Sequence, residues 1–182
     1  MRATAFGLPD TASRLLASVA VDAPKGVGRF VVAASTAGVA SISFGGERPG
    51  FAADRSAPAA AQRHAELAAD QLRNYFTGER RVFDLSLDLR GSEFQRAVWR
   101  RLTEIPFGET TTYGRLAAEL GRPGAARAVG LANHDNPIAI VVPCHRVIGA
   151  DGSLTGYAGG LGLKRWLLDH ERSNAPLWSE IP

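Results

Sequence analysis

The sequence predicts an α+β fold in which a small sheet-plus-helix domain is followed by a mainly helical domain. Strand-like alternation of apolar and polar residues occurs in the first half, whereas apolar residues recur at helical spacing through most of the second half. The character of the chain changes at Arg90-Gly91. We therefore expect an N-terminal domain over residues 1–90 and a C-terminal domain over residues 91–182.

The N-terminal half is predicted to be a small sheet with one helix against it. The expected strands are residues 29–35, 39–44 and 83–89, and the expected helix covers residues 65–76 and ends at Thr77-Gly78. Residues 1–24 show no clear periodicity and are expected to form a loose extension, and residues 45–58 are expected to form a loop. No catalytic cluster is evident in this half, so we interpret it as structural.

The C-terminal half begins with three expected helices. Ser92 and Gln95 have the spacing of a capping box at the start of the first helix. A second helix follows from about Thr112, and a glycine-containing turn over residues 121–124 leads into a third helix over residues 125–133. Two short helices across such a turn are typical of a helix-turn-helix, although a plain helical hairpin has the same pattern.

The third helix is poor in side chains that read base edges in the major groove. Its small residues are Ala125, Ala126, Ala128, Gly130 and Ala132. Arg127 is its only long cation and would project alone from that surface. Small side chains allow a backbone to approach a partner closely, so this helix would bind DNA with little sequence preference. The alternative is that its alanines pack against the core.

The single cysteine, Cys144, lies in the run Pro143-Cys144-His145-Arg146. It follows the apolar stretch 138–142, which is expected to be a short strand buried on both faces. A thiol beside an imidazole suggests an activated nucleophile, while a small buried hydrophobe is the alternative. In an extended backbone the side chain of His145 would point away from that of Cys144. Cooperation between them therefore needs a turn or a bridging water molecule.

Glu171 lies at the end of an otherwise apolar helical stripe that contains Leu163 and Leu167. A carboxylate in that position costs free energy unless it is paired. A histidine that relays a proton from the thiol is the expected partner, and an arginine ion pair or exposure at the helix end are the alternatives. Tyr113 could donate a proton or stack on a base, and Tyr157 lies in a loop that could close over a pocket; packing is the alternative for both.

Composition narrows the class of protein. Hydrophobic residues at 45% and charged residues at 21% describe an ordinary globular chain. One cysteine excludes a disulfide framework and a cysteine-rich zinc site, and it favours a reducing compartment. Neither a signal peptide nor an apolar run of roughly 20 residues is evident, so we expect a cytoplasmic protein without membrane contact. A net charge of +3 permits nucleic-acid binding without arguing for it.

Taken together, these residues resemble one family. The run over residues 138–148, Ile-Ala-Ile-Val-Val-Pro-Cys-His-Arg-Val-Ile, is similar to the active-site signature of the O6-alkylguanine-DNA alkyltransferases, also called methylated-DNA–protein-cysteine methyltransferases. The similarity also covers residues 94–102, 106–113, 125–136 and 156–171. It is very specific between Gly91 and Arg172 and looser over residues 25–90.

The resemblance implies a single-turnover DNA repair activity. In such proteins a flipped, alkylated guanine enters a pocket, and a cysteine takes the alkyl group from its O6 atom irreversibly. By this resemblance Cys144 is the acceptor, His145 removes its proton through a water molecule, and Glu171 orients His145. Tyr113 would protonate the departing guanine or stabilise its charge, and Asn136 would brace the backbone beside the active site. The resemblance implies no cofactor and no metal here.

The resemblance also implies how the substrate is bound. The partner would be double-stranded DNA that contains O6-alkylguanine, approached from the minor groove by a monomer that could cluster on DNA. Arg127 would fill the gap left by the flipped base. The other residues expected at the DNA are Tyr113, Ala126, Ala128 and Gly130. The pocket would use the backbone of Cys144, Val147 and Ala158, with Tyr157 in its wall.

Two features depart from the family pattern. The N-terminal half has no cysteine to support the metal site that some relatives carry there, and position 158 is alanine where relatives often have serine. A non-enzymatic binder of damaged DNA and, more weakly, a cysteine hydrolase are the alternative functions. The range of alkyl groups and the preference between guanine and thymine lesions stay open.

Overall fold

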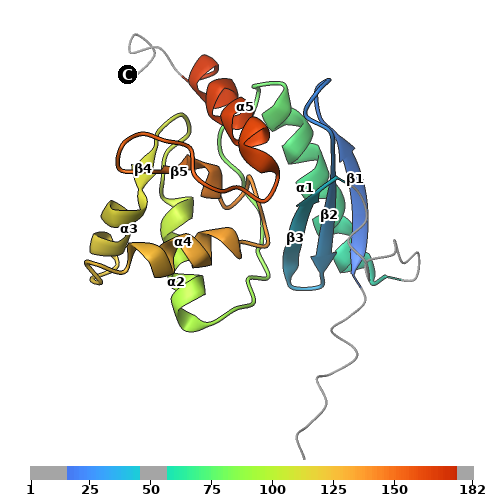
Figure 1. The fold of residues 1–182 in the computed structure, drawn as a ribbon. Helices are drawn as coiled ribbons and strands as arrows, with labels where there is room; N and C mark the ends of the chain where they lie inside the picture. The colour runs from blue at the N-terminus through green and yellow to red at the C-terminus, as the bar shows by residue number, and fades with distance from the viewer. Residues whose placement is uncertain (1–15, 46–56, 176–182) are drawn as a thin grey trace, which may run out of the picture.

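The computed structural model describes residues 16–45 and 57–175. A three-stranded sheet with one helix on its face lies beside a group of helices formed by the C-terminal part of the chain (Figure 1). The β3 edge of the sheet faces this helical group, and α1 covers the sheet (Figure 1). The α+β class predicted from the sequence is confirmed.

The sheet is antiparallel, with its strands in chain order. It consists of β1 (Ala17–Asp22), β2 (Arg29–Ser35) and β3 (Gly38–Phe44). The two strands predicted for this region are confirmed as β2 and β3. Gly38 turns the chain between them with φ +149°, and a Cβ at this position would collide with the carbonyl of Ser86.

The prediction that residues 1–24 form a loose extension is wrong for residues 17–22, which form β1. This strand pairs with β2 at the sheet edge, and Val21 is buried. Its sequence, ASVAVD, alternates only weakly because its small alanines lie on both faces, so the strand depends on its partner more than on its own pattern. Residues 1–15 and most of the predicted loop 45–58 lie outside the described residues.

Helix α1 (Ala59–Phe76) packs on the sheet, as its spacing predicts, and ends at Thr77 and Gly78. After it, residues 83–89 do not form the regular strand predicted from their alternation. Leu87 makes one isolated bridge to Val39 of β3, because the segment touches the sheet there while it crosses toward the second half of the chain. The alternate leucines and Phe83 still pack against the core.

The second half holds the predicted helix-turn-helix. Helix α2 (Glu93–Thr103) begins at the predicted capping box, and β4 (Thr111–Thr112) leads into α3 (Tyr113–Glu119). A tight turn follows, with Gly121 at φ +68°, and α4 (Ala126–His134) packs against both α2 and α3. Helix α5 (Gly160–Ser173) returns toward α1 (Figure 1).

The segment that carries the cysteine differs from the prediction. Residues 138–142 form a turn with isolated bridges in place of a continuous strand, and Ile140 has φ +74°. The side chain of Asn136 stabilises this turn by donating to the Val142 carbonyl at 2.7 Å and accepting from the Ile138 amide at 3.0 Å. A short 3-10 helix, Cys144–Arg146, follows and leads into β5 (Val147–Ile148), which pairs with β4 in parallel.

Among the helices in the described part of the chain, none has the length and apolar character needed to cross a membrane.

Candidate active site

A pocket of about 420 Å³ lies where β3, the loop after α4 and the segment 156–158 meet. Cys144 lies in its wall and is 5% exposed. The other lining residues used below are Phe44, Asn133, Asn136, Ala139, Tyr157 and Ala158. The N-terminal sheet and the C-terminal helices therefore both contribute to the space in front of the thiol.

Burial governs the chemistry of Cys144. Desolvation raises the pKa of the thiol from 9.0 to about 11, although Asn136 and the nearby charge of Lys164 act in the opposite direction. The Cys144 amide donates to the Val142 carbonyl at 2.8 Å, which fixes the backbone at the reactive residue. At neutral pH the thiol is protonated, so nucleophilic attack requires a base that removes its proton.

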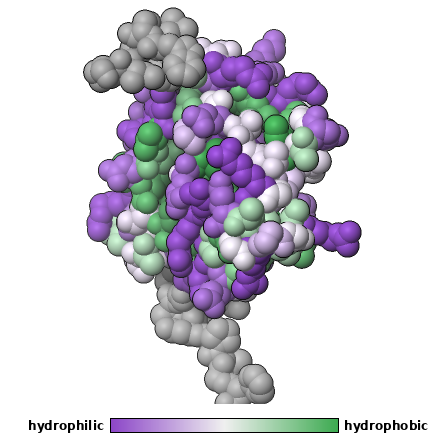
Figure 2. Space-filling model, turned by 90° about the vertical axis from the view of Figure 1, so that its left-hand side faces the viewer, coloured by the Kyte–Doolittle hydropathy of each residue, from purple (hydrophilic) through white to green (hydrophobic). Residues whose placement is uncertain are grey.

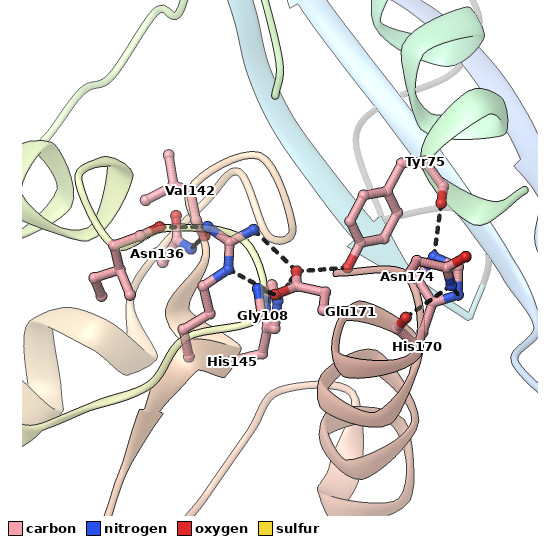
Figure 3. Close-up of polar contacts among 10 residues, drawn as sticks. Tyr75, Gly108, Asn136, Val142, His145, His170, Glu171 and Asn174 are labelled. Atoms are coloured by element: carbon pink, nitrogen blue, oxygen red, sulfur yellow. Dashed lines mark hydrogen bonds and ion pairs between the residues drawn. The ribbon is translucent and has the colours of Figure 1, made fainter. Parts of the chain in front are cut away.

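His145 is fully buried and is held by the carboxylate of Glu171 (Figure 3). Its Nε2 lies 2.7 Å from Glu171 Oε1. A carboxylate only accepts hydrogen bonds, so Nε2 carries the hydrogen and Nδ1 of a neutral ring has a free lone pair. Nδ1 is buried and has no hydrogen-bond partner among the described residues. Burial lowers the pKa of His145, which keeps the ring neutral and able to accept a proton.

Glu171 accepts hydrogen bonds from four residues, which come from three separate segments of the sequence (Figure 3). The donors are Tyr75 Oη at 2.8 Å, His145 Nε2 at 2.7 Å, Arg146 Nε and Nη2 at 2.9 Å each, and the Gly108 amide at 3.1 Å. Burial opposes ionisation, but the hydrogen bonds from His145 and Arg146 and the charge of Arg146 outweigh it and hold the pKa of Glu171 below its ordinary value. The sequence offered a histidine or an arginine as the partner of Glu171, and in the structure both His145 and Arg146 donate to it.

The sequence analysis did not identify two buried polar side chains near the site, those of Lys164 and Tyr75. Lys164 is 0% exposed and donates from Nζ to the carbonyls of Val147 at 2.7 Å and Thr155 at 3.0 Å. It lies seven positions before Glu171 on the same buried stripe of α5, so the spacing that identified Glu171 also indicates Lys164. Tyr75 gave no signal, because an aromatic residue on the apolar side of a helix is indistinguishable from core.

Of the remaining predicted site residues, Tyr157 and Ala158 line the pocket, whereas Tyr113 and Val147 lie outside its lining. Tyr113 accepts a hydrogen bond from Thr155 Oγ1 at 2.9 Å and lies against Gly130 of α4. The rings of Tyr157 and Phe44 have centroids 5.6 Å apart, and Ala158 lines the pocket beside them. Val147 is buried outside the pocket lining, where its carbonyl accepts from Lys164.

Helix α4 divides its small residues between the core and the surface. Val129 and Ala132 are buried, Ala126 and Gly130 are partly buried, and Arg127 and Ala128 are exposed. Within the described residues, Arg127 makes no hydrogen bond or ion pair. The neighbouring face that carries α3 is largely hydrophilic, with apolar side chains gathered in smaller patches (Figure 2).

Across residues 16–45 and 57–175, no group of three or more histidine, cysteine or acidic side chains is arranged to hold a metal ion.

A buried thiol with an imidazole and a carboxylate behind it is the arrangement of an activated cysteine nucleophile, and the adjacent helix-turn-helix is a motif that binds DNA, so together they indicate a protein that modifies DNA through a cysteine. Two family models match this chain: the ribonuclease-like domain of 6-O-methylguanine DNA methyltransferase at residues 25–89, and its DNA binding domain at residues 93–173. The chain belongs to the 6-O-methylguanine DNA methyltransferase family, as the resemblance of its cysteine segment predicts.

Curated relatives and solved structures agree with this assignment. A methylated-DNA–protein-cysteine methyltransferase of Mycobacterium tuberculosis is 63% identical over 109 residues, which span 60% of this chain and 66% of that protein. A methylated-DNA–protein-cysteine methyltransferase of Methanosarcina acetivorans is 60% identical over 106 residues, which span 58% of this chain and 68% of that protein. A structure of M. tuberculosis OGT in complex with DNA has a TM-score of 0.76 and 47% identity, covering 87% of this chain and 94% of that one.

Proposed function

We propose that this protein repairs alkylated DNA by transferring the alkyl group of O6-alkylguanine, typically methyl, to its own Cys144, once per molecule. The observation that carries the proposal is the pocket thiol followed by a neutral, buried imidazole whose distal nitrogen is fixed by Glu171. Membership of the 6-O-methylguanine DNA methyltransferase family supports the same reaction.

The first chemical step is removal of the thiol proton. Nδ1 of His145 is the acceptor, reached through one water molecule, because Nε2 already donates to Glu171. Glu171 stays ionised through its contacts with Arg146 and stabilises the positive charge that His145 gains. The thiolate forms only when this relay operates, since burial otherwise holds the pKa of Cys144 near 11.

The second step is displacement at the alkyl carbon. Cys144 Sγ forms a bond to that carbon while the bond from carbon to guanine O6 breaks and leaves its electron pair on the base. Tyr113, whose hydroxyl oxygen accepts from Thr155, would donate its hydrogen to the departing guanine. Overall, Cys144 exchanges a hydrogen for the alkyl group and guanine gains a proton. A thioether is stable, so each molecule reacts once.

DNA engagement is assigned to the exposed side of α4. Arg127 has no partner within the described residues and is therefore available to occupy the space of a flipped base. The small side chains of Ala126, Ala128 and Gly130 support a close approach in the minor groove with little sequence preference. Flipping costs a few kcal/mol and is least costly for a badly paired base, which favours damaged guanine. We propose that the protein acts in the cytoplasm and that one monomer binds each lesion.

Mass spectrometry of the protein after incubation with duplex DNA tests this function. With duplex containing O6-methylguanine, we expect one methyl group on the peptide that contains Cys144 and an equal amount of restored guanine in the DNA. The undamaged duplex of the same sequence is the control substrate. The Cys144→Ala variant is the control protein, and it should bind DNA without becoming methylated.

The same experiment separates the alternatives. Tight binding of the lesion without modification of Cys144 would replace the transfer reaction by a non-enzymatic damage binder. Methylation of the DNA-treated protein at any other residue would contradict the role of Cys144.

A further inference from the structure

Tyr75 is a residue of the N-terminal domain whose side chain reaches the proton relay of the C-terminal domain. It lies in the last turn of α1, is 0% exposed, and donates from its hydroxyl to Glu171 Oε1 at 2.8 Å (Figure 3). The two residues are 96 positions apart in the sequence. The contact therefore depends on how the sheet domain and the helical domain pack together.

Tyr75 and His145, the proposed general base, donate to the same oxygen atom of Glu171. Oε1 of Glu171 accepts from Tyr75 at 2.8 Å, from His145 at 2.7 Å and from Arg146 Nη2 at 2.9 Å. Each additional donor withdraws electron density from that oxygen, so the hydrogen bond from Tyr75 makes it a weaker acceptor for the hydrogen of His145. Desolvation, together with the charge and hydrogen bond of Glu171, raises the pKa of Tyr75 well above its ordinary value, so its hydroxyl remains a neutral donor.

Helix α5 also forms a hydrogen bond with the backbone of Tyr75. The carbonyl of Tyr75 accepts from His170 Nε2 at 2.7 Å, and His170 immediately precedes Glu171. The His170 ring is stacked on Trp166, with centroids 4.9 Å apart and an interplanar angle of 6°, so its orientation is fixed. Two consecutive residues of α5 thus hold the two polar ends of one residue of α1.

We propose that Tyr75 is a positioning residue for alkyl transfer, acting through Glu171 to keep His145 neutral and correctly oriented. The proposal rests on the proposed function of Cys144 and extends it by giving the N-terminal domain a part in the chemistry. The other titratable groups facing the relay are Cys144, Arg146, Tyr157 and Lys164, with His170 behind Tyr75. Of the side chains that donate to Glu171, Tyr75 and His145 are neutral and Arg146 is charged.

The test is Tyr75→Phe, which retains the ring and removes the hydroxyl. Glu171 Oε1 then becomes a stronger acceptor, protonated His145 is favoured and its pKa rises. The acidic limb of the pH–rate profile should move to higher pH by about half a unit, so the rate on the acidic side of the midpoint should fall about threefold while the rate on the plateau changes much less. The rate is measured as methyl transfer to Cys144 and, independently, as alkylation of this single cysteine by iodoacetamide.

Gln71→Met is the matched control. Gln71 lies one turn earlier on α1 and exchanges two hydrogen bonds with the backbone of Asp84 without touching Glu171. It should reduce the free energy of unfolding and leave the midpoint of the acidic limb unchanged. An unchanged limb in Tyr75→Phe, or the same shift in Gln71→Met, would overturn the proposal.

Two further readouts keep the result decisive. If Tyr75→Phe folds poorly, 3-fluorotyrosine at position 75 supplies a more acidic donor and should move the limb to lower pH. Failure of the proposed function is recognised separately, since the wild-type protein would then take no methyl group from DNA. The iodoacetamide profile would still report whether Tyr75 affects the relay.

Discussion

The buried relay and the exposed side of α4 each present an arginine, and they hold it in opposite ways. Arg146 is buried, donates from Nε and Nη2 to Glu171 and from Nη1 to the Ile105 carbonyl, and lies over the ring of Phe107. Arg127 is exposed and makes no hydrogen bond or ion pair with the described residues.

This difference separates two requirements of the reaction. Proton transfer needs donors and acceptors fixed before substrate arrives, because reorganising charges in a buried site during the reaction is costly. Insertion into DNA needs a side chain that is free to leave water and enter the duplex. Variants in the relay should therefore impair every reaction of Cys144, while variants on α4 should impair only reactions with duplex DNA.

Arg146→Met should have the largest effect. It leaves the Glu171 carboxylate buried without its cation, so we expect a loss of about 3–5 kcal/mol in the free energy of unfolding and loss of transfer from duplex and free base alike. Urea denaturation and single-turnover transfer measure the two effects. Arg165→Met, an exposed change on α5, is the stability control and should stay within about 0.5 kcal/mol of wild type. A stable Arg146→Met variant would contradict the tight coupling of this network.

Arg127→Ala should have the next largest effect, confined to duplex DNA. Without the inserted side chain the flipped state loses stabilisation of the order of the flipping cost, so transfer from duplex should fall about tenfold or more. Reaction with free O6-alkylguanine should stay within about twofold of wild type, since Arg127 lies outside the pocket lining. Arg63→Ala on α1 removes the same charge elsewhere. Equal losses with both substrates would remove Arg127 from base flipping.

The residues that the structure brings together at the candidate site in the C-terminal half were indicated by local signals in the sequence. Cys144 and His145 are adjacent, and Glu171 interrupts an apolar stripe, which marks a buried carboxylate in need of a partner. The capping box of α2 and the turn before α4 are likewise local patterns. Each of these features can be recognised within a window of about ten residues.

The features that sequence reasoning missed depend on distant contacts. Strand β1 is weakly patterned and is defined by its pairing with β2. The cysteine segment has a strand-like composition, yet the side chain of Asn136 and the positive φ of Ile140 make it a turn. Tyr75 meets Glu171 only after the two domains pack, so no pattern in its own helix distinguishes it from a core aromatic residue.

The buried relay should also make stability depend on pH. Burial holds the pKa of folded His145 below its ordinary value of 6.5, so the unfolded chain binds a proton that the folded chain excludes. As pH falls below about 6.5, the free energy of unfolding should decrease by up to about 1.4 kcal/mol per pH unit until the folded ring also titrates. Glu171, with a lowered pKa, adds a further loss below its ordinary value of 4.5.

Urea denaturation between pH 7 and pH 5 measures this dependence. His145→Gln removes the titrating ring while keeping an amide that can donate to Glu171, so its slope over this interval should be smaller than that of the wild-type protein. An identical slope in the variant would show that His145 is not the group responsible.

Leu131→Ala should have the smallest effect and defines how far along α4 the DNA contact extends. Leu131 is 63% exposed and lies one turn after Arg127, toward the pocket. If this turn enters the minor groove, its side chain packs on deoxyribose, and its truncation should weaken duplex binding about two- to threefold. Fluorescence anisotropy at fixed salt measures the binding. Leu67→Ala, a 48% exposed leucine on α1, is the control and should bind like wild type. Unchanged binding in Leu131→Ala would confine the contact to the first turn of α4 and leave the approach to the pocket open to solvent.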